Sequence, residues 1–373
     1  MRKEIYVIVH QPLSNYTLDR FGLNQYLNNK ITYLNILPLI NLKAHQAYEN
    51  SNIKKDNFLD FKSILSLFKF LNKNKKNFYY VNLTGKNFIG ILIEIFFNFQ
   101  GGIKFEIIQP SIPLIKKKNF NLNKKITFNK LKNKIKDIFQ SIIYFLFCKK
   151  AKILFISNNF NLNKFKKNQS TLKINHLDFY NFHKNKKQNQ TKEYFCFIDQ
   201  EQENSFENKL FFKNSYIPRY LDRISKLLKN IENKTGLKVK IALHHRRGKI
   251  IPKEFEIFDC SIDNTIEIIK NSQFVLTHNS TALNFAIMAK KPINLIWLEE
   301  FSYRLSKYLT FKTLEQEIDC SIIKEKDNLE DLDFQRKINN AKYDKYIENY
   351  INFNQKISFE HPWKTIDKEI GRL

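Results

Sequence analysis

The sequence predicts an α/β protein made of two domains, and three observations support that class. Short apolar runs typical of buried strands alternate with amphipathic stretches typical of helices in both halves of the chain. Residues 158–192, rich in Asn, Lys and Gln, separate the two series as a linker would. The 373 residues, 43% of them hydrophobic, can build two cores of ordinary size. We expect an N-terminal domain over 1–190, a C-terminal domain over 191–328, and a helical tail over 329–373 that can pack back on the first domain.

The first domain opens with a strand, a polar loop and a helix that begins near Asp19, the usual start of an α/β domain. The strands expected in it are Lys3–His10, Lys30–Leu39, Phe78–Leu83, Lys104–Gln109 and Ala151–Ser157, and two further helices are expected at Phe58–Leu71 and Phe88–Phe99. Apolar residues between Leu131 and Leu146 recur at helical spacing among lysines, which predicts a basic amphipathic helix. Two roles stay open for this helix: packing on the domain with a solvated Lys face, or lying on a membrane surface.

The second domain shows a cleaner alternation, typical of a parallel sheet with crossover helices. Its strands are expected at Tyr194–Ile198, Lys238–Leu243, Phe274–Thr277 and Ile293–Trp297, and its helices at Tyr216–Lys234, Asn264–Lys270 and Thr281–Ala289. The tail has a helical pattern with Tyr343, Ile347 and Tyr350 on one side.

The net charge of +27 suggests a nucleic-acid partner, but the kind of cation argues against one. Only nine of the 63 basic residues are Arg, the residue best suited to phosphates and base edges. About two thirds of the excess lies in residues 104–192, which hold 21 Lys against three acidic residues. We interpret the charge as compositional drift that can serve against an anionic membrane surface, and we expect no nucleic acid as a partner.

Short sequence patterns argue against a membrane-spanning protein, a secreted protein, and a protein with a Cys-based metal site or a glycine-rich phosphate loop. The longest apolar run, Ile142–Cys148, falls far short of the ~20 residues of a membrane-spanning helix, and the first ten residues do not form a signal peptide. We expect a cytoplasmic protein that can associate peripherally with the inner membrane. The four cysteines show no C-x-x-C spacing, and the eight glycines form no phosphate-binding loop, so side chains and helix ends must hold any phosphate.

The strongest local pattern lies between Phe274 and Ile293, where a short strand ends in four polar residues, namely His278, Asn279, Ser280 and Thr281. Such a turn lies at the carboxyl edge of a parallel sheet, where ligands of open α/β folds bind. The free N–H groups of the following helix favour an anion there. The alternative is that Asn279 or Ser280 only caps the helix, but a cap requires one polar side chain and this turn has four.

A second strand end carries His244, His245, Arg246 and Arg247 at the same predicted sheet edge. A histidine or arginine in that place can neutralise a phosphate as its charge develops. The alternative, a solvated basic loop, fits Arg247 better than His244, because His244 directly follows the strand.

A third polar residue, Asp199, follows the first strand of the second domain. It can bind a ribose or an acceptor hydroxyl, or it can cap the turn that follows. The sequence favours neither role.

The order of these residues resembles the C-terminal half of GT-B glycosyltransferases that build bacterial capsule and lipopolysaccharide. The match covers about residues 194–297 and runs through Asp199-Gln200, Gly236, His244, Arg246, His278, Ser280-Thr281-Ala282 and Lys291-Pro292. It is similar to sialyltransferase-like and Kdo-transferase-like enzymes, which use CMP-activated acidic sugars. This chain has His245 where the family usually has Pro, and it lacks a clear acidic D/E-D/E-G motif in the first domain.

The resemblance implies two Rossmann-like domains facing a cleft, with the acceptor on the side of the first and the nucleotide-sugar donor on the second. It implies that His244 stabilises the leaving phosphate and that Ser280 and Thr281 bind it. Asp199, Arg246, His278 and Asn279 are the further candidates for donor binding. The implied reaction is a metal-independent, inverting transfer without a cofactor, from a nucleotide sugar to a glycan or a lipid-linked glycan.

Such a transfer needs a group that takes the acceptor proton, and the resemblance implies that the first domain supplies it. Asp19 is the candidate, with an N-cap or an ion pair of its helix as the alternative role. Two other functions stay open: a nucleotide-sugar epimerase of the same architecture, and a non-catalytic basic protein that binds anionic lipid or nucleic acid.

Overall fold

The computed structural model describes most of the chain, and the chain forms two compact units. The described residues are 3–10, 15–25, 27–40, 55–73, 78–84, 88–109, 142–157, 169–185, 193–204, 216–244, 247, 250–262, 264–299, 305–352 and 360–373. The first unit comprises Met1–Gln109, Lys117–Leu177 and Lys356–Leu373, and the second comprises Pro110–Lys116 and Asp178–Gln355.

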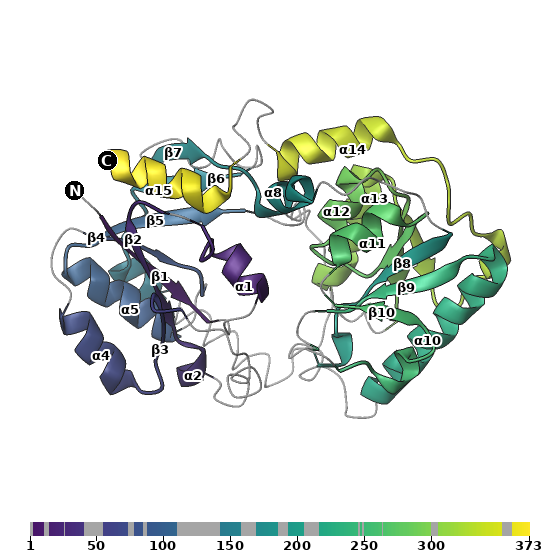
Figure 1. Ribbon diagram of the computed structural model, residues 1–373, viewed down its shortest axis with the longest axis horizontal. Helices are drawn as coiled ribbons and strands as arrows, with labels where there is room; N and C mark the ends of the chain where they lie inside the picture. Colours follow the sequence, from purple (N-terminus) through teal and green to yellow (C-terminus); the bar gives the residue numbers. More distant parts are fainter. Residues whose placement is uncertain are drawn as a thin grey trace. The chain divides into compact units, whose positions relative to one another are not determined.

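The first unit contains a parallel sheet of seven strands in the order β3-β2-β1-β4-β5-β6-β7 (Figure 1). The strands are β1 (Glu4–Val9), β2 (Lys30–Asn35), β3 (Phe58–Asp60), β4 (Phe78–Asn82), β5 (Ile103–Ile108), β6 (Ile153–Ile156) and β7 (Ser170–Lys173). The central strands are apolar on both sides, as the buried run from Ile5 to Val9 shows, because helices cover both faces of a parallel sheet.

Different helices cover the two faces of this sheet. The unit contains α1 (Asn15–Arg20), α2 (Leu37–Ile40), α4 (Ile64–Lys73), α5 (Phe88–Phe99), α15 (Pro362–Arg372) and a short helical segment at residues 142–147. Leu67 of α4 and Phe97 of α5 pack with one set of strand side chains, and Trp363 of α15 packs with the other. Helices α4 and α5 therefore lie on one face of the sheet, and α15 lies on the opposite face.

The last helix is joined to the first unit by polar contacts as well as by its apolar side. The Asp367 carboxylate accepts the backbone N–H groups of Asn28 and Asn29 at 2.7 and 2.9 Å. The Trp363 indole N–H donates to the Arg20 carbonyl at 3.0 Å, and its ring lies 5.9 Å from that of Tyr33. Residues more than 300 positions apart in the chain thus complete one core.

The second unit contains six parallel strands in the order β10-β9-β8-β11-β12-β13. They are β8 (Tyr194–Ile198), β9 (Lys238–Ala242), β10 (Asp259–Ser261), β11 (Val275–Thr277), β12 (Ile293–Trp297) and β13 (Ser321–Lys324). The helices are α8 (Leu177–Lys184), α10 (Tyr216–Thr235), α11 (Thr265–Asn271), α12 (Leu283–Met288), α13 (Leu305–Ile318) and α14 (Asn340–Tyr346). Among its described residues, the unit also has three short 3₁₀ helices, η1 (Gln202–Asn204), η3 (Lys253–Phe255) and η5 (Leu329–Asp331), and a π-helix, η6 (Ile347–Ile351). Helix α10 is amphipathic, since Tyr220, Ile224, Leu228 and Ile231 are buried at helical spacing.

The predicted α/β class, with two Rossmann-like units, is confirmed. Both sheets have the strand order in which the chain starts at the centre, builds outward on one side, and returns to continue on the other. The order reverses between β1 and β4 in the first sheet and between β8 and β11 in the second. In folds of this type, ligands bind at the carboxyl ends of the two strands that flank the reversal.

Some predicted elements were wrong. Phe58–Leu71 is not one helix: β3 occupies Phe58–Asp60, and α4 begins at Ile64. The predicted linker over 158–192 contains β7, which pairs with β6, and α8, which buries Leu177 and Phe182. Of the predicted basic amphipathic helix, residues 142–147 are helical, and residues 131–141 lie outside the described residues.

Candidate functional site

Three loops meet the carboxyl edge of the second sheet at neighbouring strands. They follow β8, β9 and β11, which are adjacent in the sheet, and the β8–β11 pair flanks the reversal of strand order. The residues predicted for donor binding lie on these loops, apart from Arg246, which lies outside the described residues.

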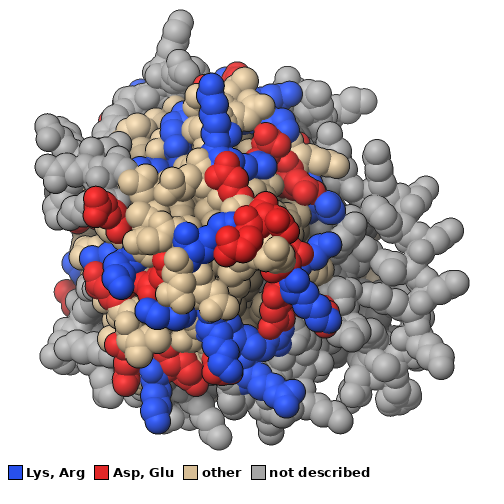
Figure 2. Space-filling model, turned by 90° about the vertical axis from the view of Figure 1, so that its right-hand side faces the viewer, with Lys and Arg blue, Asp and Glu red and all other residues tan. Residues whose placement is uncertain are grey.

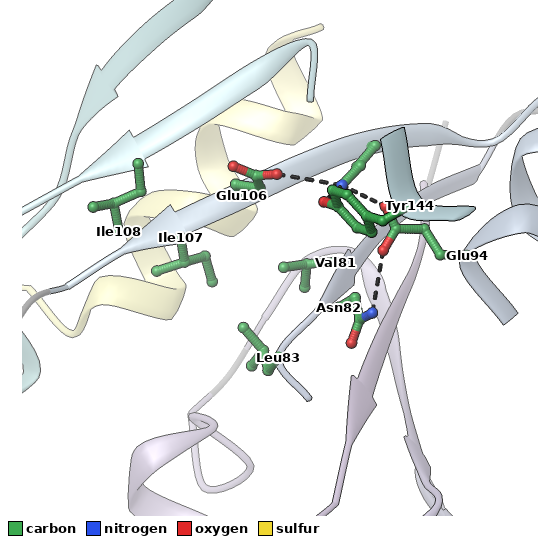
Figure 3. A pocket seen from close by; sticks show the side chains of 9 residues that line it. Val81, Asn82, Leu83, Glu94, Glu106, Ile107, Ile108 and Tyr144 are labelled. Atoms are coloured by element: carbon green, nitrogen blue, oxygen red, sulfur yellow. Dashed lines mark hydrogen bonds and ion pairs between the residues drawn. The ribbon is translucent and has the colours of Figure 1, made fainter. Parts of the chain in front are cut away.

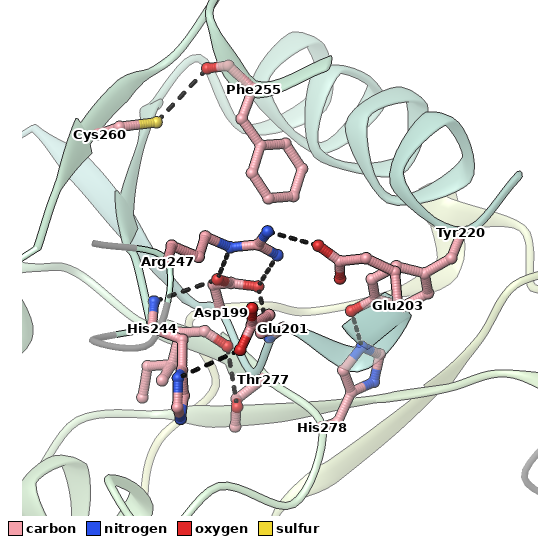
Figure 4. A network of polar contacts seen from close by, with 11 residues as sticks. Asp199, Glu201, Glu203, Tyr220, His244, Arg247, Phe255, Cys260, Thr277 and His278 are labelled. Atoms are coloured by element: carbon pink, nitrogen blue, oxygen red, sulfur yellow. Dashed lines mark hydrogen bonds and ion pairs between the residues drawn. The ribbon is translucent and has the colours of Figure 1, made fainter. Parts of the chain in front are cut away.

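The loops after β8 and β9 are joined by a buried ion pair (Figure 4). The Arg247 Nη2 donates to Asp199 Oδ1 at 3.0 Å, its Nε donates to Asp199 Oδ2, and its Nη1 pairs with Glu203. The three side chains are at most 6% exposed. The Phe255 ring lies 5.9 Å from the guanidinium. Arg247 is therefore a buried anchor, and the expectation that it belongs to a solvated loop was wrong.

The electrostatics of this pair favour a charged Asp199. Burial opposes ionisation of that carboxyl, but hydrogen bonds and charge from Arg247 hold its pKa below the ordinary value. Burial raises the pKa of Glu203, and Arg247 offsets only part of that rise. Two carboxylates thus share one guanidinium, and Asp199 holds the stronger part of the interaction.

Asp199 also caps the turn after β8, the second of its two predicted roles. Its Oδ1 accepts the N–H of Glu201 at 3.0 Å and its Oδ2 accepts the N–H of His244 at 3.1 Å. With a residue exposure of 2%, the carboxylate has no open side for a ligand. Asp199 therefore positions the loops, and the alternative of direct donor contact is not supported by its geometry.

His244 lies at the end of β9 with its backbone fixed by Asp199 and its ring near a second carboxylate. The His244 Nδ1 is 3.9 Å from Glu201 Oε2, and the two side chains are 21% and 11% exposed. Glu201 has a left-handed backbone with φ of 51°, a conformation that a non-glycine residue keeps only when its surroundings fix it. No local pattern identifies Glu201 as a site residue, because the turn that carries it depends on Asp199 and Arg247.

His278 does not face the sheet edge. Its ring is fully buried, with Nδ1 2.8 Å from the Ile296 carbonyl oxygen and Nε2 2.9 Å from the Tyr220 hydroxyl. Since a carbonyl oxygen only accepts, Nδ1 carries the proton and Nε2 accepts from Tyr220. His278 is a histidine of the core, and its assignment to donor binding is corrected on this ground.

The next three residues remain at the surface of the edge. Asn279 and Ser280 are partly exposed and Thr281 is exposed, just after β11. Ser280 Oγ accepts the N–H of Ala282 at 3.2 Å, so this hydroxyl stabilises the turn that leads into α12. The N-cap of α12 is Ala282, without a side-chain cap hydrogen bond, so the alternative that Asn279 or Ser280 only caps this helix was wrong. The Ser280 hydroxyl hydrogen can still be donated to a ligand.

The candidate base, Asp19, belongs to the first unit. Helix α1 begins at Asn15, so Asp19 lies near its end, and the alternative role as an N-cap was wrong. The Asp19 carbonyl accepts from His361 Nε2 at 2.9 Å, which ties this turn to the residue before α15.

His10 is a candidate that the sequence analysis missed. It directly follows β1, one of the two strands at the reversal of the first sheet, and its side chain is exposed. Desolvation by neighbouring atoms and then the charge of Arg20 lower the pKa of His10. The available signal was the one that pointed to His244, a histidine directly after a buried strand.

The first unit also contains a cavity of about 270 Å³ at the carboxyl ends of β4 and β5 (Figure 3). One wall is charged: Lys104, 3% exposed, pairs with Glu94 and Glu106 and donates to the Tyr144 hydroxyl at 2.6 Å. Burial opposes the charge of Lys104, but Glu94 raises its pKa above the ordinary value. The other wall is apolar and consists of Val81, Leu83, Ile107 and Ile108.

The described residues hold no cluster of three or more His, Cys, Asp and Glu that could bind a metal ion. The four cysteines are free thiols, and burial raises the pKa of Cys260 to about 11. Among the described helices, none combines the length and the apolar character that crossing a bilayer requires.

Comparison with known proteins gives distant structural similarity and no sequence match. No family model and no curated protein matches the chain. The structure is similar to the Methanocaldococcus jannaschii UDP-GlcNAc 2-epimerase, with a TM-score of 0.48, 13% identity, and 99% and 98% of the two chains covered. It is also similar to the wall teichoic acid polymerase TagF, with a TM-score of 0.48, 12% identity, and 98% and 89% covered. A putative UDP-N-acetylglucosamine 2-epimerase from Listeria monocytogenes gives a TM-score of 0.49, 9% identity, and 100% and 98% covered.

Proposed function

We propose that the protein is a glycosyltransferase of GT-B type that moves a sugar from a nucleotide-activated donor to a hydroxyl of a glycan acceptor. The observation that carries the proposal is the placement of His244. It follows β9 at the carboxyl edge of the second sheet, its N–H is bound by Asp199, and a fifth of its side chain stays in contact with solvent. An imidazole in that place can donate a hydrogen bond to the phosphate that leaves with the nucleotide.

The donor binds at the same edge, between the loop of His244 and the loop after β11. Asn279, Ser280 and Thr281 offer one amide and two hydroxyls at the surface of that loop. Hydroxyl and backbone N–H groups are common partners of phosphate oxygens. We favour a CMP-linked acidic sugar as the donor, because the residues that resemble a known family resemble the CMP-dependent enzymes in it.

The acceptor oxygen attacks the anomeric carbon while the bond from that carbon to the donor phosphate breaks, and the acceptor proton passes to a base. His10 and Asp19 of the first unit are the candidate bases. His10 is the better candidate, since it is exposed at the reversal of strand order and its lowered pKa keeps the ring neutral near pH 7.

The cavity at the carboxyl ends of β4 and β5 is our candidate for holding a sugar of the acceptor. A pyranose ring has polar edges and apolar faces, and the cavity has one wall with Glu106 and Tyr144 and another of aliphatic side chains. The pair of acidic side chains around the single Lys104 disfavours an anionic group in it.

Binding of the nucleotide is the first test. The purified protein is mixed with CMP, UDP and the corresponding sugar nucleotides, and the melting temperature is followed. A ligand at 100 times its Kd stabilises the folded state by about 2.7 kcal/mol, which is readily measured. If no nucleotide or nucleotide sugar shifts the melting temperature, the proposal is wrong.

Transfer is the second test, with His244→Ala and His183→Ala compared. His183 is an exposed histidine of α8 in the same unit, so its removal controls for the loss of a surface imidazole. We expect transfer to fall by about 10²-fold or more in His244→Ala and to stay unchanged in His183→Ala. Turnover of a UDP-sugar without any acceptor would instead identify an epimerase, and salt-sensitive polyanion binding unchanged in His244→Ala, without turnover, would identify a non-catalytic basic protein.

A further inference from the structure

The outer surface of three helices in the first unit is unusually apolar. Of the fifteen exposed large hydrophobic side chains among the described residues, ten lie on α4, α5 and residues 142–147. The most exposed are Leu65 at 67%, Phe99 at 81%, Phe145 at 82% and Leu146 at 64%. We call the exposed apolar side chains of these three segments the apolar helix face. Exposed apolar patches of this kind mark surfaces that a membrane or a partner protein covers.

The three segments form one layer over the same face of the sheet. Phe68 of α4 lies 5.9 Å from Phe96 of α5, measured between ring centroids, and Gln100 after α5 donates to the Leu71 carbonyl at 3.0 Å. On the other side of α5, Asn98 donates to the carbonyl of Phe147 at 3.2 Å. The side chains of the apolar helix face therefore belong to one continuous layer.

The helices of this layer carry apolar side chains on the side away from the sheet as well as on the side that packs against it. In α4, Leu67 and Leu71 are buried against the sheet, yet Ile64, Leu65 and Phe68 are exposed. A helix that packs on a single core normally carries polar residues at such positions. Apolar side chains on the solvent side indicate that the layer has two apolar neighbours, the sheet beneath it and something above it.

Among the described side chains, the exposed charges on the three segments, and those directly after residue 147, are basic. The single acidic residue within α4, α5 and residues 142–147 is Glu94, which is 1% exposed and paired with Lys104. Lys69 on α4 and Lys149 and Lys150 after residue 147 are exposed. Elsewhere the surface differs: on the face shown in Figure 2, acidic and basic side chains are interspersed.

We propose that the apolar helix face is a docking surface for an anionic lipid bilayer. Phenylalanine and leucine side chains enter the interface between headgroups and acyl chains, and the flanking lysines pair with anionic headgroups. A second copy of the chain is a poorer occupant, since two surfaces edged by lysine, on chains with a net charge of +27, repel each other. The proposal is independent of the reaction proposed above, and it would bring the site to acceptors carried on lipid.

The test is sedimentation of the full chain with vesicles at about 0.1 M salt. We expect binding to vesicles of phosphatidylcholine with about 30% phosphatidylglycerol, and binding at least tenfold weaker to phosphatidylcholine alone. The double variant Phe145→Ser, Leu146→Ser should bind the anionic vesicles at least tenfold more weakly. The matched control is Ile250→Ser, Ile257→Ser, which removes two side chains of the second unit that are 75% and 70% exposed.

A second readout keeps the test independent of changes in folding. Phe145→Trp should show a blue shift of its fluorescence on addition of anionic vesicles, and Ile250→Trp should show none. Absence of binding to anionic vesicles, equal loss in the control variant, or no blue shift at position 145 would each overturn the proposal. So would concentration-dependent dimerisation, measured by sedimentation velocity, that Phe145→Ser, Leu146→Ser abolishes, because a second copy would then be the occupant.

Discussion

The carboxylate of Glu201 lies 3.9 Å from Nδ1 of His244, and both residues take their positions from Asp199, whose two oxygens accept their backbone N–H groups. A carboxylate beside one nitrogen of an imidazole holds a proton on that nitrogen and orients the ring, and it stabilises the imidazolium form, in which the other nitrogen also carries a proton and can donate to a phosphate. If His244 acts on the donor phosphate through Nε2, Glu201 is the residue that positions it.

We therefore expect Glu201→Gln to lower the rate of transfer about tenfold while the Kd for the nucleotide changes less than about twofold. Gln keeps the length of the side chain and removes its charge. Steady-state kinetics together with calorimetric titration of the nucleotide separate the two quantities. Glu267→Gln, on α11 of the same unit, is the control, and an equal loss in that variant would refute the positioning role.

Replacing Arg247 by Met should destabilise the protein by about 3–5 kcal/mol, because Asp199 and Glu203 would stay buried without their cation. Urea unfolding at pH 7 measures the change, and Arg372→Met, which removes an exposed pair with Glu369, should change stability by less than about 0.5 kcal/mol. A loss below about 1 kcal/mol in Arg247→Met would show that the pair is not a structural anchor.

The pH dependence of the free energy of unfolding should differ between the wild type and Arg247→Met. In the wild type the pKa of Asp199 is lowered in the folded state, so its contribution is present above the unfolded pKa, about 3.9, and is lost as the pH falls through the lower folded value. The pKa of Glu203 is already raised in the wild type, and in Arg247→Met the pKa of Asp199 rises above its unfolded value too, so the variant should gain more stability than the wild type as the pH falls from 7 toward 5. Urea midpoints across this range test it, and a parallel pH profile in the two proteins would contradict it.

His278→Leu should lower the free energy of unfolding by about 1–3 kcal/mol and leave nucleotide affinity unchanged. The reason is that the ring is buried between Tyr220 and the Ile296 carbonyl, and the substitution removes the hydrogen bonds that join the ring to these two groups. Unfolding curves and a nucleotide titration are needed together. A tenfold loss of nucleotide affinity in a folded His278→Leu protein would restore this residue to the donor site.

If His10 is the base, transfer should decline as the pH falls through the lowered pKa of its ring, below the ordinary value of 6.5. Arg20→Gln removes a nearby positive charge, so it should raise this pKa and move the acid limb of the rate profile toward higher pH. Asp19→Asn should leave the limb in place. Loss of transfer in Asp19→Asn, together with an unmoved limb in Arg20→Gln, would assign the base to Asp19.

The central strands and long helices could be predicted from the sequence because each depends on its own residues. The run from Ile5 to Val9 is apolar enough to be buried on both faces, and α10 repeats its buried apolar positions at helical spacing from Tyr220 to Ile231. The short edge strands β3, β7 and β10 could not be predicted with equal ease, since three or four residues with one or two apolar side chains carry almost no periodic signal.

The location of the candidate site could be predicted from the sequence, but the orientation of its side chains could not. Polar residues directly after strands identified the sheet edge, because the carboxyl ends of parallel strands share it. Whether a ring there faces solvent or the core depends on distant residues: Tyr220 holds His278 inside, and Arg247 covers Asp199. Neither contact can be deduced from the local pattern.

Helix α15, which completes the core of the first unit, is synthesised after the whole of the second unit. Residues 1–177 supply its sheet, but the apolar side formed by Phe21 and Tyr33 receives Trp363, Ile366 and Ile370 only after the whole second unit has been translated. A nascent chain therefore carries an uncovered aromatic surface for at least 180 codons. Ribosome-associated chaperones that hold exposed aromatic segments are the natural protection for such a chain, and a fragment that ends before α15 should aggregate unless the helix is supplied as a separate peptide.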